Sequence, residues 1–245
     1  VIERLQEANI DTSLTQVVPF EARKTNAEDS NLPMLAILIP LILTIAISVG
    51  GGPSAADLFA GEKEKKTMEA LLMTPVNRST LLFAKYLTIA SVGIIIGFVT
   101  LVVVAIEIAF FTENLKAAVN FNGNTGAVLT VGTLVMVIYS LFVASILTIT
   151  SILGKTVKEA QSYSMPIMML TVFPIMMLTG LGVNEFATKH FILPFVNIFA
   201  IITELLFGIV DYSHLLVTSL SNIAIIIILL IASRIMFAKD KWVLD

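Results

Sequence analysis

Five long runs of uncharged, mostly apolar residues constrain the fold of this chain more than any other feature. An apolar helix of about 20 residues crosses the hydrocarbon core of a bilayer, which is roughly 30 Å thick. Runs of that length lie at about 33–54, 86–110, 127–153, 165–182 and 215–236. Only 13% of the residues are charged, against about 25% in a typical globular protein. The sequence therefore predicts an all-α integral membrane protein, a helical bundle with five transmembrane spans in a transmembrane domain over 32–237.

Some of the apolar runs contain residues that bend or end helices. The first span carries Pro40 and the sequence GGGP at 50–53, where we expect a kink or a broken end. Residues 191–203 are apolar but too few to cross a bilayer, which predicts a re-entrant or interfacial helix. A hairpin that enters the membrane and returns to the same side is suited by the polar and helix-breaking residues Asn184, Pro194, Asn197 and Glu204. We therefore expect an external re-entrant hairpin over 185–212.

The basic residues divide unevenly between the two sides of the predicted bundle. Ten fall on one side, namely Lys63, Lys65, Lys66, Arg78, Lys85, Lys155, Lys158, Arg234, Lys239 and Lys241, and five on the other, namely Arg4, Arg23, Lys24, Lys116 and Lys189. Cytoplasmic loops carry the excess of Lys and Arg. We therefore expect the connector over 57–85 and the tail over 238–245 to be cytoplasmic, in a multi-pass protein of a bacterial plasma membrane. Residues 1–31 are then the tail of an extracellular domain, which implies one further span upstream and six in the full protein.

The connector contains a charged segment that suits a helix. The residues of 62–73 are nearly all strong helix formers, and Met68, Leu71 and Leu72 recur at helical spacing. Pro75 ends this helix, and Asn77 is suited to cap the next one. An amphipathic helix of this kind suits docking to a soluble partner. The alternative is an interfacial helix whose lysines rest on anionic membrane lipid.

The sequence GEKE at 61–64, the run TMEALLMTPV at 67–76 and Arg78 resemble the signature cytoplasmic loop of type-two ATP-binding-cassette exporter permeases. Among these, the chain is most similar to the membrane subunits of NatAB-type sodium-extrusion transporters. The resemblance implies a homodimeric pore, sodium export and a separate ATP-binding cassette subunit that carries ATP and magnesium, with no cofactor on this chain. It also implies a coupling helix that contacts this ATPase through Glu62, Lys63, Glu64, Lys65, Lys66, Thr67, Met68, Glu69, Leu71, Leu72 and Pro75.

A few polar residues within the apolar runs are candidates for a substrate path. Glu107 is a carboxylate in a strongly apolar run, although its distance of about 20 residues from Lys85 also suits the water-exposed outer edge. The hydroxyl residues Thr88, Ser91, Thr100 and Thr148 can line a path or bond their own helix backbone. Glu204 suits an external gate. The many methionines of the fourth span favour instead a path for a lipid, a peptide or an antibiotic.

Catalytic and metal chemistry find little support in the sequence. The chain has no cysteine, and its two histidines lie too far apart in the sequence to suggest a metal cluster. The sequence Gly154-Lys155-Thr156 lacks the earlier glycine of a phosphate-binding loop, since Ile149 stands there, so we expect no ATPase site. We expect no catalytic residue and no nucleic-acid partner. An intramembrane enzyme and a non-transporting membrane scaffold are the remaining alternatives.

Overall fold

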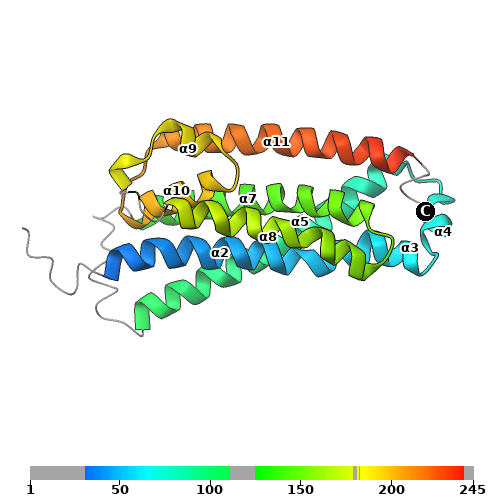
Figure 1. Ribbon diagram of the computed structural model, residues 1–245, viewed down its shortest axis with the longest axis horizontal. Helices are drawn as coiled ribbons and strands as arrows, with labels where there is room; N and C mark the ends of the chain where they lie inside the picture. The colour runs from blue at the N-terminus through cyan, green and yellow to red at the C-terminus, as the bar shows by residue number, and fades with distance from the viewer. Residues whose placement is uncertain (1–30, 111–124, 179–180, 182, 240–245) are drawn as a thin grey trace, which may run out of the picture.

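Long antiparallel helices lie side by side in the computed structural model (Figure 1). It describes residues 31–110, 125–178, 181 and 183–239, and these include no strand. Five helices are long and apolar enough to span a membrane. They are α2 (Asn31–Ala56), α5 (Arg78–Phe110), α7 (Thr125–Leu153), α8 (Val157–Leu178) and α11 (Tyr212–Ala238). The predicted all-α bundle with five spans is confirmed.

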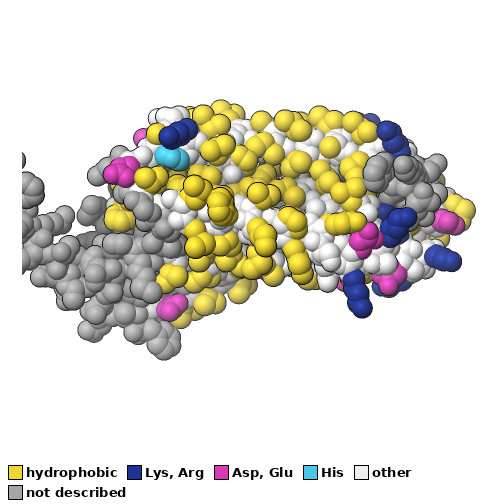
Figure 2. Space-filling model, in the orientation of Figure 1, with side chains coloured by type: hydrophobic (Ala, Val, Ile, Leu, Met, Phe, Trp, Pro, Cys, Tyr) yellow, Lys and Arg dark blue, Asp and Glu magenta, His cyan; other side chains and the backbone are white. Residues whose placement is uncertain are grey.

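Short helices occupy the two ends of this bundle. The connector end carries η2 (Asp57–Gly61), α3 (Glu62–Glu64) and α4 (Met68–Leu72). The hairpin end carries η3 (Val183–Glu185), α9 (Thr188–Ile192) and α10 (Val196–Leu206). On the face seen in Figure 2, hydrophobic side chains cover the middle of the bundle, while Lys and Arg side chains gather at the connector end. On this face, positive charge is therefore concentrated at the connector end, although Lys189 of α9 lies at the other end.

Helix α7 lies at the centre and packs against α2, α5, α8 and α11. Its side chains Tyr139 and Phe142 are fully buried. The outward faces of α5, α8 and α11 instead carry exposed large apolar residues such as Phe98, Met169 and Ile228. A bundle that is apolar both inside and outside suits a hydrocarbon environment, in which apolar side chains have no water to avoid.

The first long helix does not break where its glycines and proline predict. Helix α2 continues through Pro40 and the segment 50–53, and then passes into η2, which is a π-helical turn. Phe59 in this turn is buried and packs edge-on against Phe237 of α11, with ring centroids 5.8 Å apart. The wider turn therefore places an aromatic anchor at the point where the membrane helix becomes the connector.

Two helices begin earlier than their apolar runs predict. Helix α5 begins at Arg78, directly after Asn77 as the predicted cap requires, although its apolar run begins only near residue 86. Helix α8 begins at Val157 and not near residue 165. The hydropathy pattern predicts only the part of a helix that lies in hydrocarbon. Polar residues such as Lys158 are good helix formers in water, so the helix can begin before its apolar part. Both helices thus extend past the apolar zone at the connector end.

The apolar run over 191–203 is divided between two helices and does not form a single one. Leu193 ends α9 with φ −74° and ψ 121°, because a residue before proline disfavours the helical conformation. Phe195 follows with φ 67° and ψ −41°, and its ring packs edge-on against Phe142 at 5.0 Å. Phe142 lies in the middle third of α7, so the turn at Pro194 reaches deep into the bundle before the buried helix α10 returns.

The turn between α7 and α8 leaves no room for a side chain at Gly154. A Cβ atom there would lie 2.7 Å from the backbone nitrogen of Ala160 and 2.8 Å from its Cα. We predict that Gly154→Ala destabilises the protein by about 1–3 kcal/mol, as overpacking does, and lowers Tm in detergent. Gly132→Ala in α7 is the control, since its Cβ would meet Leu205 at an ordinary 3.8 Å. Equal Tm values for the two variants would contradict this close approach.

Candidate functional site

The connector consists of two short helices, so the continuous helix predicted over 62–73 is wrong. Helix α3 ends at Glu64 and α4 begins at Met68. Lys66 between them has φ 56°, the left-handed conformation that commonly ends a helix. The N–H groups of Lys66 and Thr67 donate to the carbonyl oxygens of Lys63 and Glu62, both at 2.9 Å. The composition of this segment favours one continuous helix. The contacts that α3 makes with the long helices hold it in an orientation that α4 does not continue.

Two neighbouring residues of α3 bind opposite kinds of helix end. The ammonium group of Lys63 donates to the carbonyl oxygens of Ile152 and Gly154, at 2.6 and 3.3 Å, where α7 ends. The carboxylate of Glu64 accepts a hydrogen bond from the N–H of Val157, at 3.0 Å, where α8 begins. A cation at a helix C-terminus and an anion at an N-terminus both interact favourably with the helix dipole. The pair therefore holds the α7–α8 turn against the connector.

Glu62 binds a third helix through a buried lysine. Lys85 of α5 is only 5% exposed, and its ammonium group forms an ion pair with the Glu62 carboxylate. It also donates to the carbonyl oxygen of Leu58 and lies 5.0 Å from the centroid of the Phe59 ring. A buried ammonium is costly unless it is paired, so these groups fix α5 against η2 and α3.

The connector also contacts the last helix. Phe59 of η2 packs against Phe237 of α11, and Arg78, the first residue of α5, donates to the carbonyl oxygen of Ala238, the final residue of α11, at 3.2 Å. Helix α2 passes directly into the connector through η2. All five long helices thus contact the connector or are continuous with it. A displacement of this short segment would act on every span.

The apolar stripe of α4 points into the protein. Met68 is 2% exposed, and Leu71 and Leu72 are half-buried against the core. The exposed surface of the connector combines charged and polar residues with apolar ones, among them Met73 at 81% exposed and Val76 at 50%. Of the predicted coupling residues, those exposed in the structure are Glu64, Lys65, Lys66, Thr67, Glu69 and Pro75. The predicted set is therefore divided between residues that hold the bundle and residues that face outward.

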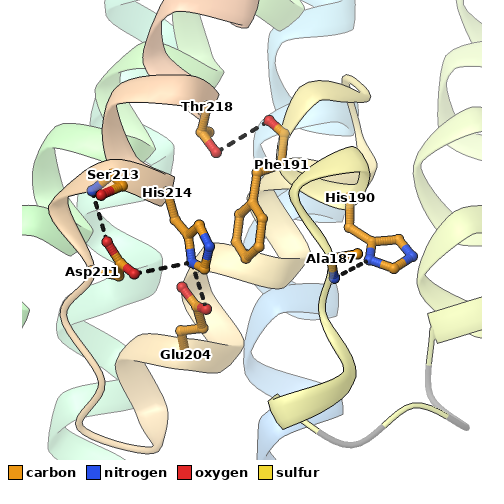
Figure 3. A network of polar contacts seen from close by, with 8 residues as sticks. All are labelled: Ala187, His190, Phe191, Glu204, Asp211, Ser213, His214 and Thr218. Carbon is orange, nitrogen blue, oxygen red and sulfur yellow. Dashed lines mark hydrogen bonds and ion pairs between the residues drawn. The ribbon is translucent and has the colours of Figure 1, made fainter.

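The predicted path residues lie at separate places. Thr88, Ser91 and Thr100 of α5 donate to carbonyl oxygens of their own helix, at 3.0, 2.8 and 2.8 Å, and buried Thr148 does the same in α7 at 2.8 Å. Hydroxyl groups that bond to the backbone of their own helix are not evidence that these residues line a substrate path. Glu107 is exposed on α5. Glu204 is buried at the hairpin end and bonds to His214 (Figure 3).

A cluster of hydroxyl groups near the middle of the bundle was not predicted from the sequence. Ser48 of α2 lies 3.2 Å from the hydroxyl of Tyr139 in α7 and 3.5 Å from that of Thr171 in α8. Three separate helices meet there through hydroxyl oxygens. Each residue is an isolated hydroxyl in an apolar run, and no spacing relates them, so the only sequence signal was their polarity.

The whole chain is similar to known membrane proteins. The family described as ABC-2 family transporter protein matches residues 3–242. The ABC transporter permease protein NatB of Bacillus subtilis (strain 168) is 36% identical to the chain over 247 residues. The match covers 100% of this chain and 64% of that relative, so the chain spans less than two thirds of the length of the relative. No solved structure matches the chain.

The role of Lys63 in holding the α7–α8 turn is testable by substitution. Lys63→Met keeps the length of the side chain but removes the charged donor. Hydrogen bonds to charged groups contribute about 1.5–3 kcal/mol, so we predict a lower Tm in detergent. Lys65→Met, two residues away and exposed, is the matched control and should leave Tm unchanged. A Lys63→Met protein as stable as the control would show that the bonds to α7 contribute nothing.

Proposed function

The chain belongs to the ABC-2 family of transporter proteins, and we propose that it is the membrane permease subunit of an ATP-driven exporter. The family match extends over residues 3–242, and five helices suit a membrane. The observation that carries the proposal is that the short segment formed by η2 and α3 continues α2 and contacts the other four long helices. This arrangement suits a subunit that is moved from outside by another protein.

In this proposal the partner is an ATP-binding cassette ATPase, which carries the ATP and magnesium. It docks on the exposed face of the connector, through Lys65, Lys66, Glu69, Met73 and Val76, all of which are accessible. The connector end and the C-terminus are then cytoplasmic, in keeping with the Lys and Arg residues gathered there. Two copies of the permease pair around a central path within the lipid.

Closure of two ATPase subunits on ATP would move the docked connectors. Because Lys63 and Glu64 hold the α7–α8 turn and Glu62 holds α5, the spans would follow this motion. ATP binding can shift the permease between two conformations only if it favours one of them, and these contacts supply the mechanical link. The permease itself carries out no bond chemistry.

We propose sodium as the exported substrate, on the basis of the resemblance of the connector to sodium-extrusion permeases. Oxygen ligands suit a hard cation, and hydroxyl groups of α2, α7 and α8 converge at Ser48. A lipophilic substrate is the second candidate. It is favoured by the exposed side chains of five methionines on α8, namely Met165, Met168, Met169, Met176 and Met177. Flexible thioether side chains adapt to apolar ligands.

The test is ATP-dependent uptake of radioactive sodium into inverted vesicles that contain the full-length permease and its ATPase. We predict accumulation that persists when the proton gradient is collapsed. We also predict that Met73→Asp reduces uptake at least tenfold without lowering Tm, because the side chain is 81% exposed and would face the ATPase. Leu71→Asp should lower Tm instead, since that leucine packs against the core.

A hydrolysis-deficient ATPase is the control for primary transport. Intact ATP hydrolysis without sodium accumulation would reject sodium and direct the search to lipophilic substrates and the methionines of α8. Wild-type uptake by Met73→Asp would show that the exposed face of α4 is not the docking surface.

A further inference from the structure

Three elements of the hairpin end meet at His214, the third residue of α11 (Figure 3). Its Nδ1 lies 2.9 Å from a carboxylate oxygen of Glu204 in α10 and 3.8 Å from one of Asp211. Its ring stacks on that of Phe191 in α9, with centroids 3.8 Å apart and an angle of 11° between the planes. Thr218 donates to the carbonyl oxygen of Phe191 at 3.3 Å. One imidazole thus joins both hairpin helices to α11.

Glu204 is the least solvated member of this group. It is 6% exposed, and its neighbours along α10 are apolar residues such as Ile201 and Leu205, which are also buried. A carboxylate in such surroundings is stable only when it is paired with a cation or carries a proton. His214 supplies the hydrogen bond, but the charge on the imidazole depends on its own proton. The stability of the contact between hairpin and α11 therefore depends on how many protons the group holds.

The set of side chains at the site favours a proton over a metal ion as its ligand. The cavity beside Glu204 and Asp211 has a volume of about 10 Å³, roughly the space of a single water molecule. In the part of the chain that the structure describes, no group of three or more His, Cys, Asp or Glu side chains could hold a metal. The Asp211 side chain is 43% exposed, which gives a proton a route to solvent.

We propose that Glu204, His214 and Asp211 form a proton-binding latch that holds the hairpin against α11 while protonated and releases it when protons leave. Protonation of Glu204 neutralises its buried carboxylate, which shares the His214 imidazole with the carboxylate of Asp211. A neutral group is favoured in apolar surroundings. Loss of that proton leaves two neighbouring carboxylates at one site, which favours separation of the helices.

The direction of the expected pH dependence follows from the two carboxylates. Burial raises the pKa of Glu204 above its ordinary value, although His214 offsets part of this effect. The backbone N–H of Ser213 lowers the pKa of Asp211, which stays ionised. A docked state with a raised pKa binds its proton more tightly than an undocked one. Docking is therefore strongest at low pH, and weakens by up to about tenfold per pH unit as pH rises through the raised pKa.

Few other charged groups face this site from the elements packed around it. Helices α2 and α7, which pack against α10, carry no Asp, Glu, Lys, Arg or His within their described lengths. The charged residues of α8, Lys158 and Glu159, lie at its opposite end. Among the residues that the structure describes, the other titratable ones near the hairpin are Glu185, Lys189, His190 and Tyr212. His190 accepts a hydrogen bond from the N–H of Ala187 at 3.0 Å, within its own turn.

The latch can be tested by the distance between spin labels in the full-length permease in lipid nanodiscs. The cysteine-free sequence allows clean labelling of Ile192→Cys on α9 and Ile235→Cys on α11, both about half exposed. Ile235 lies 14 residues beyond Ser221, which bonds to Ile192, so the separation along α11 is about 21 Å. We expect the docked fraction to fall as pH rises through the raised pKa of Glu204.

Glu204→Gln keeps the size of the side chain and its hydrogen bonding but removes the buried acid, so its docked fraction should change less with pH. His190→Gln is the matched control and should behave like the wild type. Asp211→Asn preserves a good helix N-cap and should shift the transition to lower pH, because a negative charge beside the site is lost. Three results would each overturn the proposal: a wild-type distance independent of pH, a Glu204→Gln response equal to that of the wild type, or an unshifted Asp211→Asn transition. None of them depends on the transported substrate.

Discussion

The bonds between α3 and the ends of the long helices are the interactions on which the rest of the structure depends. A helix leaves unpaired carbonyl groups at its C-terminus and unpaired N–H groups at its N-terminus. Lys63 meets the first kind at the end of α7, and Glu64 meets the second at the start of α8. Exchanging the two charges would place each next to a helix end of the same sign. The order Lys-Glu therefore fixes which way the connector lies across the α7–α8 turn.

The two ends of the bundle are built on different principles. The connector end holds its helices together with ion pairs and caps at the surface, around the buried Lys85. The hairpin end inserts a short buried helix, α10, and depends on aromatic contacts and on the Glu204–His214 pair. Between them, α7 contacts all four other long helices. Helix α7 also contacts η2 at the connector end and α10 at the hairpin end, so one central helix touches elements of both ends.

Sequence reasoning predicted the long helices because hydrocarbon leaves little choice: a spanning segment must be helical and apolar. It did not predict the break at Lys66, because every local preference in 62–73 favours a helix and only distant contacts oppose it. The Glu62–Lys85 ion pair joins residues 23 positions apart in the sequence, and no local sequence pattern predicts it. The sequence also did not predict that Leu71 and Leu72 pack against the core of the protein. An amphipathic pattern shows that one face of a helix is apolar, but it does not show whether that face contacts the protein core or a partner. The sequence placed Glu204 in the hairpin, but its partner His214 follows ten residues later, across a turn.

In the proposed exporter, the connector and the α7–α8 turn move as one body when the ATPase binds and hydrolyses ATP. The direct measurement is the distance between spin labels at Lys65→Cys and Lys158→Cys, both exposed, in the full-length permease with its ATPase. Labelled chains would be diluted with unlabelled ones, so that only distances within one chain are recorded. The account predicts the same distance with and without ATP, and an ATP-dependent distance once Lys63→Met and Glu64→Gln remove the bonds. An ATP-dependent distance in the chain that retains Lys63 and Glu64 would contradict it.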